Sequence, residues 1–257
     1  YEKDKNEERM SSDQALDLIH HFYIKVSRLN KVRPWPETRL KSGAPMFMTL
    51  TLGGVTKNGA DASNELTYLF LEALRETRLP QPTPILRVHE DTPKELLVFS
   101  ADILANHGGG LPAFFSDNAN IEALMNMGIP VEEAREYGIS GCSEATIPGK
   151  SLSFTGGDCY FNFLKILEIV LHEGVNPRTG WNIFPTKKLE EHHCIEDIIT
   201  EFQRHLSMYM SLVVPLAAVT SATDAELNPT PFTSGTIDYR IQMASDMSEG
   251  GGENAKY

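Results

Sequence analysis

Apolar residues along the chain follow two patterns, which alternate from the N-terminus to the C-terminus. Between Asp13 and Leu29 they recur every three or four positions, which predicts an amphipathic helix that Ser11 or Ser12 can cap. The same spacing predicts further helices, of which Ser63 is expected to cap the first, over 63–78, 93–106, 120–126, 130–137, 160–173 and 195–212. Short apolar runs bounded by glycine or proline predict strands at 46–54, 85–88 and 111–117, and a short strand or loop at 138–142.

This alternation of strands and helices indicates an α/β fold with mostly parallel strands. The sequence contains no internal repeat and no low-complexity block that would divide it. In such folds the carboxyl ends of the strands meet at one edge of the sheet, and functional residues tend to lie on the loops there. Candidate catalytic residues are therefore expected near the ends of the predicted strands.

The composition limits the expected partners and compartment. Of the 257 residues, 41% are hydrophobic, which allows a substantial core and argues against wholesale disorder. The formal net charge of −12 argues against nucleic acid as a partner, because phosphate binding needs a basic face. The 3 cysteines do not form a disulfide framework, and no run approaches the roughly 18 apolar residues of a membrane span. We therefore expect a cytoplasmic protein that contacts no membrane.

Three motifs suggest a chemistry that their surroundings do not support. The glycine run after His107 resembles the oxyanion loop of some lipases, but the chain lacks the G-x-S-x-G elbow of those enzymes. The adjacent residues at 192–194 (HHC) point in diverging directions and do not have the spacing of zinc ligands. Gly156–Gly157 belongs to no phosphate-binding motif, and Asp158 would repel a phosphate. We expect glycine turns, a solvated loop before a helix, and no metal site.

The segment YGISGCSEATIPGK, at 137–150, places Glu144 two residues after Cys142. In an extended segment both side chains would face one side, and the carboxylate would disfavour a thiolate. We therefore expect a protonated thiol and a carboxylate that face one buried cavity. This arrangement is poor for ionic thiol catalysis, which also needs a paired histidine, but it suits a thiyl radical that abstracts hydrogen while the carboxylate moves a proton. Spacing alone is also explained by a buried structural cysteine in a tight turn.

The GCSE segment at 141–144 is one of several segments that together resemble one enzyme family. The others are TLGGVTKNGADASNELTYLFLEA, RVHEDTP, GLPAFFSDN, PGK, and the late PFTSGTID and SEGGG. They are similar to characteristic segments of the glycyl radical enzymes, the family of pyruvate formate-lyase and its dehydratase and decarboxylase relatives. The resemblance extends over nearly the whole chain.

The resemblance implies a barrel of two opposed parallel half-sheets wrapped by helices, with the active cysteine on a finger loop inside the barrel. It implies that Cys142 carries the thiyl radical and that Glu144 is the acid–base or substrate-positioning carboxylate. Strand ends near Thr51–Gly53 would line the pocket. The residues expected to bind substrate are His89, Phe114, Phe115 and Ser116.

The resemblance also implies partners. No cofactor is expected to be bound, because a protein glycyl radical, installed by a radical S-adenosylmethionine activating enzyme, supplies the unpaired electron. The substrate would be a small organic acid, and the whole protein would be a homodimer.

Two departures from the family pattern refine this expectation. The family keeps its radical in an R-V-x-G-Y-like loop near its C-terminus, and residues 1–257 contain no such loop. We therefore expect the chain to be the central portion of the barrel domain, without the glycine radical domain and inactive alone. The dehydratase type carries a His-Asp pair after the cysteine, where this chain has SFTGGD at 153–158. This favours an arylacetate decarboxylase, with a dehydratase, a hydrocarbon-succinate synthase, a non-catalytic barrel relative or an ionic thiol enzyme as alternatives.

Overall fold

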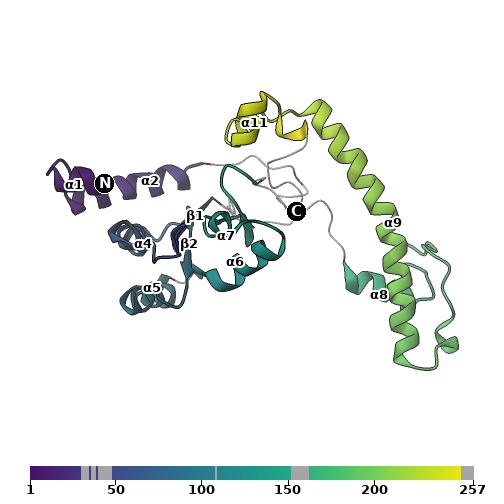
Figure 1. The fold of residues 1–257 in the computed structure, drawn as a ribbon. Helices are drawn as coiled ribbons and strands as arrows, with labels where there is room; N and C mark the ends of the chain where they lie inside the picture. Colours follow the sequence, from purple (N-terminus) through teal and green to yellow (C-terminus); the bar gives the residue numbers. More distant parts are fainter. Residues whose placement is uncertain (30–34, 36–38, 40–47, 108, 152–161, 250–257) are drawn as a thin grey trace. The chain divides into compact units, whose positions relative to one another are not determined.

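The computed structural model describes residues 1–29, 35, 39, 48–107, 109–151 and 162–249. These residues fall into two compact units, the first drawn from 1–155 and 232–257 and the second from 156–231. In the first unit, strands alternate with helices along the chain (Figure 1). The predicted α/β fold is therefore confirmed for this unit.

The first unit is built on a sheet of three parallel strands. Their bounds are β1 (Thr49–Gly53), β2 (Thr83–Val88) and β3 (Ala113–Ser116), and their order is β1-β2-β3. Thr51 lies opposite Ile85, which lies opposite Ala113 on its other side. Each strand coincides with a predicted apolar run, and both pairings in this sheet are parallel, in agreement with the prediction of mostly parallel strands.

The helices predicted for the first unit are present near their expected positions: α2 (Ser12–Ser27), α4 (Glu65–Thr77), α5 (Lys94–His107), α6 (Asp117–Asn126) and α7 (Val131–Ala134). The sequence did not predict the short elements α1 (Glu2–Asn6), α10 (Pro231–Ser234), α11 (Asp238–Met243) and a 3₁₀ turn at Met247–Glu249. Ser11 caps α2, because its Oγ accepts from the backbone N–H of Gln14 at 3.1 Å. The cap predicted for α4 is wrong by one residue: Asn64 caps the helix, while Ser63 donates its hydroxyl to Asp61.

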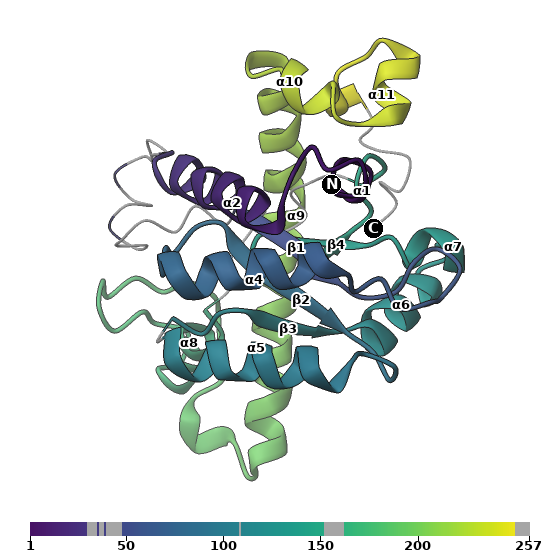
Figure 2. The ribbon, with the colours of Figure 1, turned by 90° about the vertical axis from the view of Figure 1, so that its left-hand side faces the viewer.

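Two apolar clusters cover the two faces of the sheet. On one face, Leu86 packs with residues of α2, α4 and α5, and Figure 2 shows α4 and α5 lying across the strands. On the other face, Ile85 and Phe115 pack with residues of α6 and of the segment that follows α7. Consecutive residues of a strand, such as Ile85 and Leu86, thus belong to different clusters, because side chains alternate between the faces of a sheet.

The Cys142 segment forms a β-hairpin on the second face of the sheet. Its strands are β4 (Gly138–Ser140) and β5 (Glu144–Thr146), which pair antiparallel with Ser140 opposite Glu144. A three-residue turn, 141–143, joins them. The sequence predicted a short strand or loop here but not the return strand β5, since three residues are too few for an apolar period.

The second unit consists of α8 (Phe163–Leu171), a 3₁₀ turn (Leu189–Glu191) and the long helix α9 (Ile195–Leu227). Its packing is anchored by His205, which is fully buried, has its ring edge-on to Phe184 and places Nε2 2.6 Å from the hydroxyl of Thr186. Burial lowers the pKa of His205 below its ordinary value, so the ring is neutral. The start predicted for the first helix, at 160, lies outside the described residues.

Helix α9 differs from two expectations from the sequence: that it ends at 212, and that no stretch of the chain has the character of a membrane span. It continues through Pro215 to Leu227 instead of ending near 212, because the residues after the proline are again good helix formers. By length and composition alone, it is the one helix in the described part of the chain that could cross a membrane. This helix was not recognised from the sequence as a possible span, because serine and threonine interrupt its apolar residues. One such helix is weak support for a membrane span.

Candidate active site

The carboxyl end of β2 carries a charged side chain that the sheet buries. Arg87 is 5% exposed and forms a bidentate ion pair with Asp117. Nε donates to Oδ1 at 2.8 Å, and Nη2 donates to Oδ2 at 2.9 Å. Gly54, the residue after β1, leaves the space for it. A Cβ at Gly54 would lie 2.6 Å from Cζ of Arg87, and its φ of +80° also favours glycine. Gly54 therefore makes room for the guanidinium group.

Tyr137 completes this group of buried side chains, which we name the Arg87 network (Arg87, Asp117 and Tyr137). The hydroxyl of Tyr137 donates to Oδ1 of Asp117 at 2.9 Å, and its ring lies 4.0 Å from the guanidinium carbon. Burial, assisted by the charge of Asp117, holds the pKa of Tyr137 well above its ordinary value. The hydroxyl therefore remains a proton donor in the hydrogen bond at neutral pH.

The hairpin that begins one residue after Tyr137 is held against β1. The Thr49 hydroxyl donates to the carbonyl of Ile139, and the Ile139 N–H donates to the Thr51 hydroxyl at 3.2 Å. Both threonines lie on the same face of β1, since they are two residues apart. Cys142 lies in the turn at the tip of this anchored hairpin, and its side chain is exposed.

Glu144 is half-buried and folds back onto the turn. Its Oε2 accepts a hydrogen bond from the backbone N–H of Ser143 at 2.9 Å. Backbone N–H groups, chiefly that of Ser143, hold the pKa of Glu144 below its ordinary value despite partial burial. A Cβ at Gly141 would lie 2.7 Å from Oε2, so the glycine allows this close approach.

The geometry corrects the sequence-based picture of the Cys142–Glu144 pair. Cys142 lies in a turn and Glu144 begins β5, so the two do not share one face of an extended strand. Within the described residues the thiol is exposed, so it does not face a buried cavity there. The predicted placement of Cys142 on a loop between two regular elements is confirmed.

His89 follows β2, and both of its ring nitrogens have partners. Nε2 lies 3.0 Å from Oδ1 of Asp61, and Nδ1 lies 3.3 Å from the backbone N–H of Asp91, which donates to it. The side chain is only 7% exposed. His89 thus holds the loop after β1, and its role in binding substrate stays a prediction.

The three candidate residues of β3 do not lie on one face. Phe115 packs into the cluster on the hairpin side, whereas Phe114 is 38% exposed and alternates to the opposite face with Ser116. Ser116 caps α6, since its Oγ accepts from the N–H of Ala119 at 3.4 Å. Of the three, Phe115 alone shares the hairpin face.

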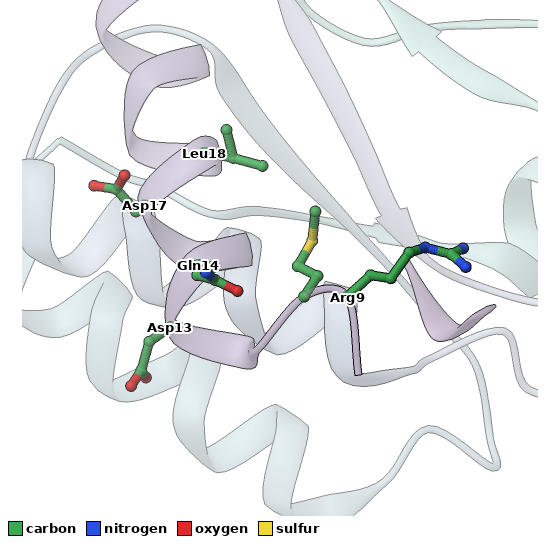
Figure 3. A pocket seen from close by; sticks show the side chains of 6 residues that line it. Arg9, Asp13, Gln14, Asp17 and Leu18 are labelled. Carbon is green, nitrogen blue, oxygen red and sulfur yellow. The ribbon is translucent and has the colours of Figure 1, made fainter. Parts of the chain in front are cut away.

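Other candidate sites are not supported by the described residues. They contain no group of three metal-ligating side chains, and Cys194 is exposed on a loop before α9, as predicted for that segment. A shallow pocket of about 550 Å³ lies at the start of α2, where Asp13 and Asp17 point away from Arg9 (Figure 3). None of the residues that line this pocket belongs to the Cys142 hairpin or to the Arg87 network.

Reasoning from the sequence missed the Arg87 network, although a signal was present. Arg87 interrupts the apolar run ILRV, and Asp117 directly follows the run AFFS. Charged residues are almost never fully buried unless they are paired, so a charge within a buried strand indicates a partner nearby. Each of the two charges lies near the carboxyl end of a predicted strand. Consecutive strands often lie next to each other in such a sheet, so Asp117 was a candidate partner for Arg87.

Comparison with known proteins agrees with the motifs and the fold. A model of the family described as "Pyruvate formate lyase-like" matches residues 1–256. The chain is 29% identical to (2S)-3-sulfopropanediol dehydratase of Klebsiella oxytoca, over 99% of this chain and 30% of that protein. It is also 29% identical to indoleacetate decarboxylase of Tractidigestivibacter scatoligenes, over 89% of this chain and 26% of that protein.

A solved structure shares the fold. The glycerol-bound form of the B12-independent glycerol dehydratase from Clostridium butyricum superposes with a TM-score of 0.89 and 32% identity, over 98% of this chain and 31% of that chain. The chain thus spans about a third of the length of these proteins, and its α/β sheet corresponds to part of their barrel. With the family model matching almost every residue, the chain belongs to the pyruvate formate-lyase-like family of glycyl radical enzymes.

Proposed function

We propose that the protein is a radical lyase in which Cys142 abstracts a hydrogen atom from a small organic substrate and Glu144 acts on a neighbouring substrate group. The observation that carries the proposal is the hairpin: it presents an exposed thiol at its tip with a carboxylate immediately beyond the turn. An ionic thiol enzyme is less well supported, because no histidine among the described residues hydrogen-bonds to Cys142.

The exposed position of Cys142 fits the chemistry that the family resemblance implies. A protein glycyl radical, installed by an S-adenosylmethionine-dependent activating enzyme, supplies the unpaired electron. The Cys142 thiyl then forms an S–H bond as a substrate C–H bond breaks, which leaves the unpaired electron on carbon. After the elimination, the thiol returns a hydrogen atom to the product radical, so that Cys142 is regenerated as a thiyl.

Glu144 is suited to accept a proton or hydrogen bond from the substrate. Its lowered pKa keeps it ionised at neutral pH, and the N–H of Ser143 holds its Oε2 in place. A bound substrate would exclude water from this carboxylate. Desolvation raises the pKa of a carboxyl group, so binding would strengthen Glu144 as a base.

Two substrate classes compete. Glu144 and the SFTGGD segment favour an arylacetate that loses carbon dioxide, although residues 153–158 lie outside the described residues. A dehydratase acting on a small polyol or hydroxy acid is the second candidate, because the similar proteins named above include two dehydratases and one decarboxylase. In either case we expect a cytoplasmic homodimer that depends on an activating enzyme.

The test uses the protein as its gene encodes it, activated without oxygen by a radical S-adenosylmethionine enzyme. Arylacetates, vicinal diols and hydrocarbon-plus-fumarate mixtures are assayed separately. We expect turnover of one class, its loss in Cys142→Ala, and its retention in Cys194→Ala, which removes an exposed thiol of the second unit. Turnover of a diol but not of an arylacetate would decide for the dehydratase. Activity that survives Cys142→Ala would refute the radical-lyase proposal.

A further inference from the structure

We infer that the Arg87 network is the device that positions the Cys142 hairpin, so that Arg87 is a positioning residue for the thiol. The network lies where β2, the start of α6 and the chain entering β4 meet. The inference concerns the hairpin's position, and its importance for catalysis rests on the proposed function.

The guanidinium group bonds the backbone directly before the hairpin. Nη2 of Arg87 donates to the carbonyl of Arg135 at 2.8 Å, and Nη1 donates to the carbonyl of Tyr137 at 3.0 Å. Gly138, the first residue of β4, follows Tyr137. An ion pair that served the core alone would not need these two carbonyl groups, which fix the direction in which the chain enters β4.

Asp117 is saturated by donors from three other segments. Its Oδ1 accepts from Arg87 and from the Tyr137 hydroxyl, and its Oδ2 accepts from Arg87 and from the N–H of Val55 at 2.9 Å. It is 1% exposed. A carboxylate held by four donors cannot shift without breaking several of them, so Asp117 holds the guanidinium fork in one orientation.

The geometry of the fork makes the arrangement specific to arginine. Its planar donors reach one carboxylate and two carbonyl groups at the same time. A lysine keeps the charge but has a single nitrogen, so it cannot hold all of these acceptors. Further along the hairpin, Thr49 and Thr51 hold Ile139, so that the strand leading to Cys142 is fixed at two successive points.

The first experiment measures amide hydrogen exchange of residues 138–146 in the full 257-residue chain. For Arg87→Lys we expect exchange there to rise at least about tenfold relative to α2 and α4, because a single hydrogen bond from a charged donor is worth that much. The matched control is Arg75→Lys, an exposed arginine of the same unit that also pairs with a carboxylate. Tyr137→Phe removes one hydroxyl and leaves both backbone carbonyls, so it should fold and raise exchange about threefold.

Two results would overturn the inference. One is hairpin exchange in both Arg87→Lys and Tyr137→Phe that equals the exchange in the Arg75→Lys control. The other is a rise spread evenly over the whole unit, which would assign the network to general stability. If Arg87→Lys does not fold, Tyr137→Phe alone decides between these outcomes.

A second experiment measures the kinetics of activated protein as its gene encodes it. Arg87→Lys should lower kcat up to about a hundredfold with KM within about twofold, because an ångström of misplacement of a reacting group has that effect. Raised hairpin exchange in a protein whose activity survives Cys142→Ala would support the inference and refute the proposed function. Unchanged hairpin exchange in Arg87→Lys, in a protein whose activity needs Cys142, would overturn the inference and support the proposed function.

Discussion

Replacing Arg87 by methionine should destabilise the first unit by several kcal/mol, because methionine keeps the aliphatic stem of the side chain but not its guanidinium group. The substitution removes four hydrogen bonds and leaves the carboxylate of Asp117 buried without its counter-charge. Removing one partner of a buried ion pair costs about 3–5 kcal/mol. Tyr137 and Val55 still donate to the carboxylate, so the loss in the free energy of unfolding should be about 3 kcal/mol.

A double-mutant cycle separates the stranded charge from the lost packing. Asp117→Asn alone leaves Arg87 buried without a counter-charge, and should also be strongly destabilising. In Arg87→Met/Asp117→Asn neither charge remains. The double variant should therefore lose at least about 2 kcal/mol less than the sum of the two single variants.

The assay is the urea dependence of hydrogen exchange at the amides of β2, which reports on the first unit separately from the second. Arg75→Met is the control, because its ion pair with Glu72 is exposed and should contribute less than about 1 kcal/mol. A loss in Arg87→Met no larger than that of the control would refute the reasoning. So would a double variant whose loss equals the sum of the single ones.

Three further outcomes can be measured on the same chain. Gly54→Ala should cost at least about 2 kcal/mol more than Gly110→Ala by urea unfolding, because both have positive φ but only Gly54 would clash with a guanidinium group; equal losses would contradict this. Lys5 holds the pKa of Glu65 at about 2, below its ordinary 4.5, so this contact stabilises the fold above that ordinary value and is lost as the pH falls towards 2. An acid titration by circular dichroism that is identical in Glu65→Gln would argue against it. Ser11→Ala should destabilise α2 by about 1 kcal/mol through loss of its capping box, and unchanged exchange in the first turn would show that the cap is dispensable.

The parts of the fold that the sequence predicted are those fixed by local pattern. The parallel strands and the helices α2, α4 and α5 follow from apolar spacing, because each buries one continuous face. The cap of α4 was assigned one residue early, since serine and asparagine are both good N-caps and only the structure shows that Ser63 is engaged by Asp61. Local pattern did not reveal β5 either.

The candidate site was predicted less completely, because its positions depend on contacts between distant segments. Cys142 and Glu144 were found from their spacing, but the turn that separates their directions was not foreseen. Phe114 and Ser116 were assigned to the pocket together with Phe115, against the alternation of a strand. The ion pair between Arg87 and Asp117 joins residues 30 positions apart, which periodicity within a window of about 18 residues does not detect.

The distances along the sequence within the Arg87 network have a consequence for the order of folding. The bonds of Asp117 and Arg87 to other segments join residues 20, 30, 48, 50 and 62 positions apart. Contacts of such separation form late, because closing long loops costs entropy before any contact can offset it. The helices can therefore collapse onto the sheet before the hairpin is fixed. Since the hydrogen bonds that anchor the hairpin come from β1 and β2, we expect Cys142 to take its place only after these strands have paired. An incompletely folded chain would then hold its thiol on an unanchored loop.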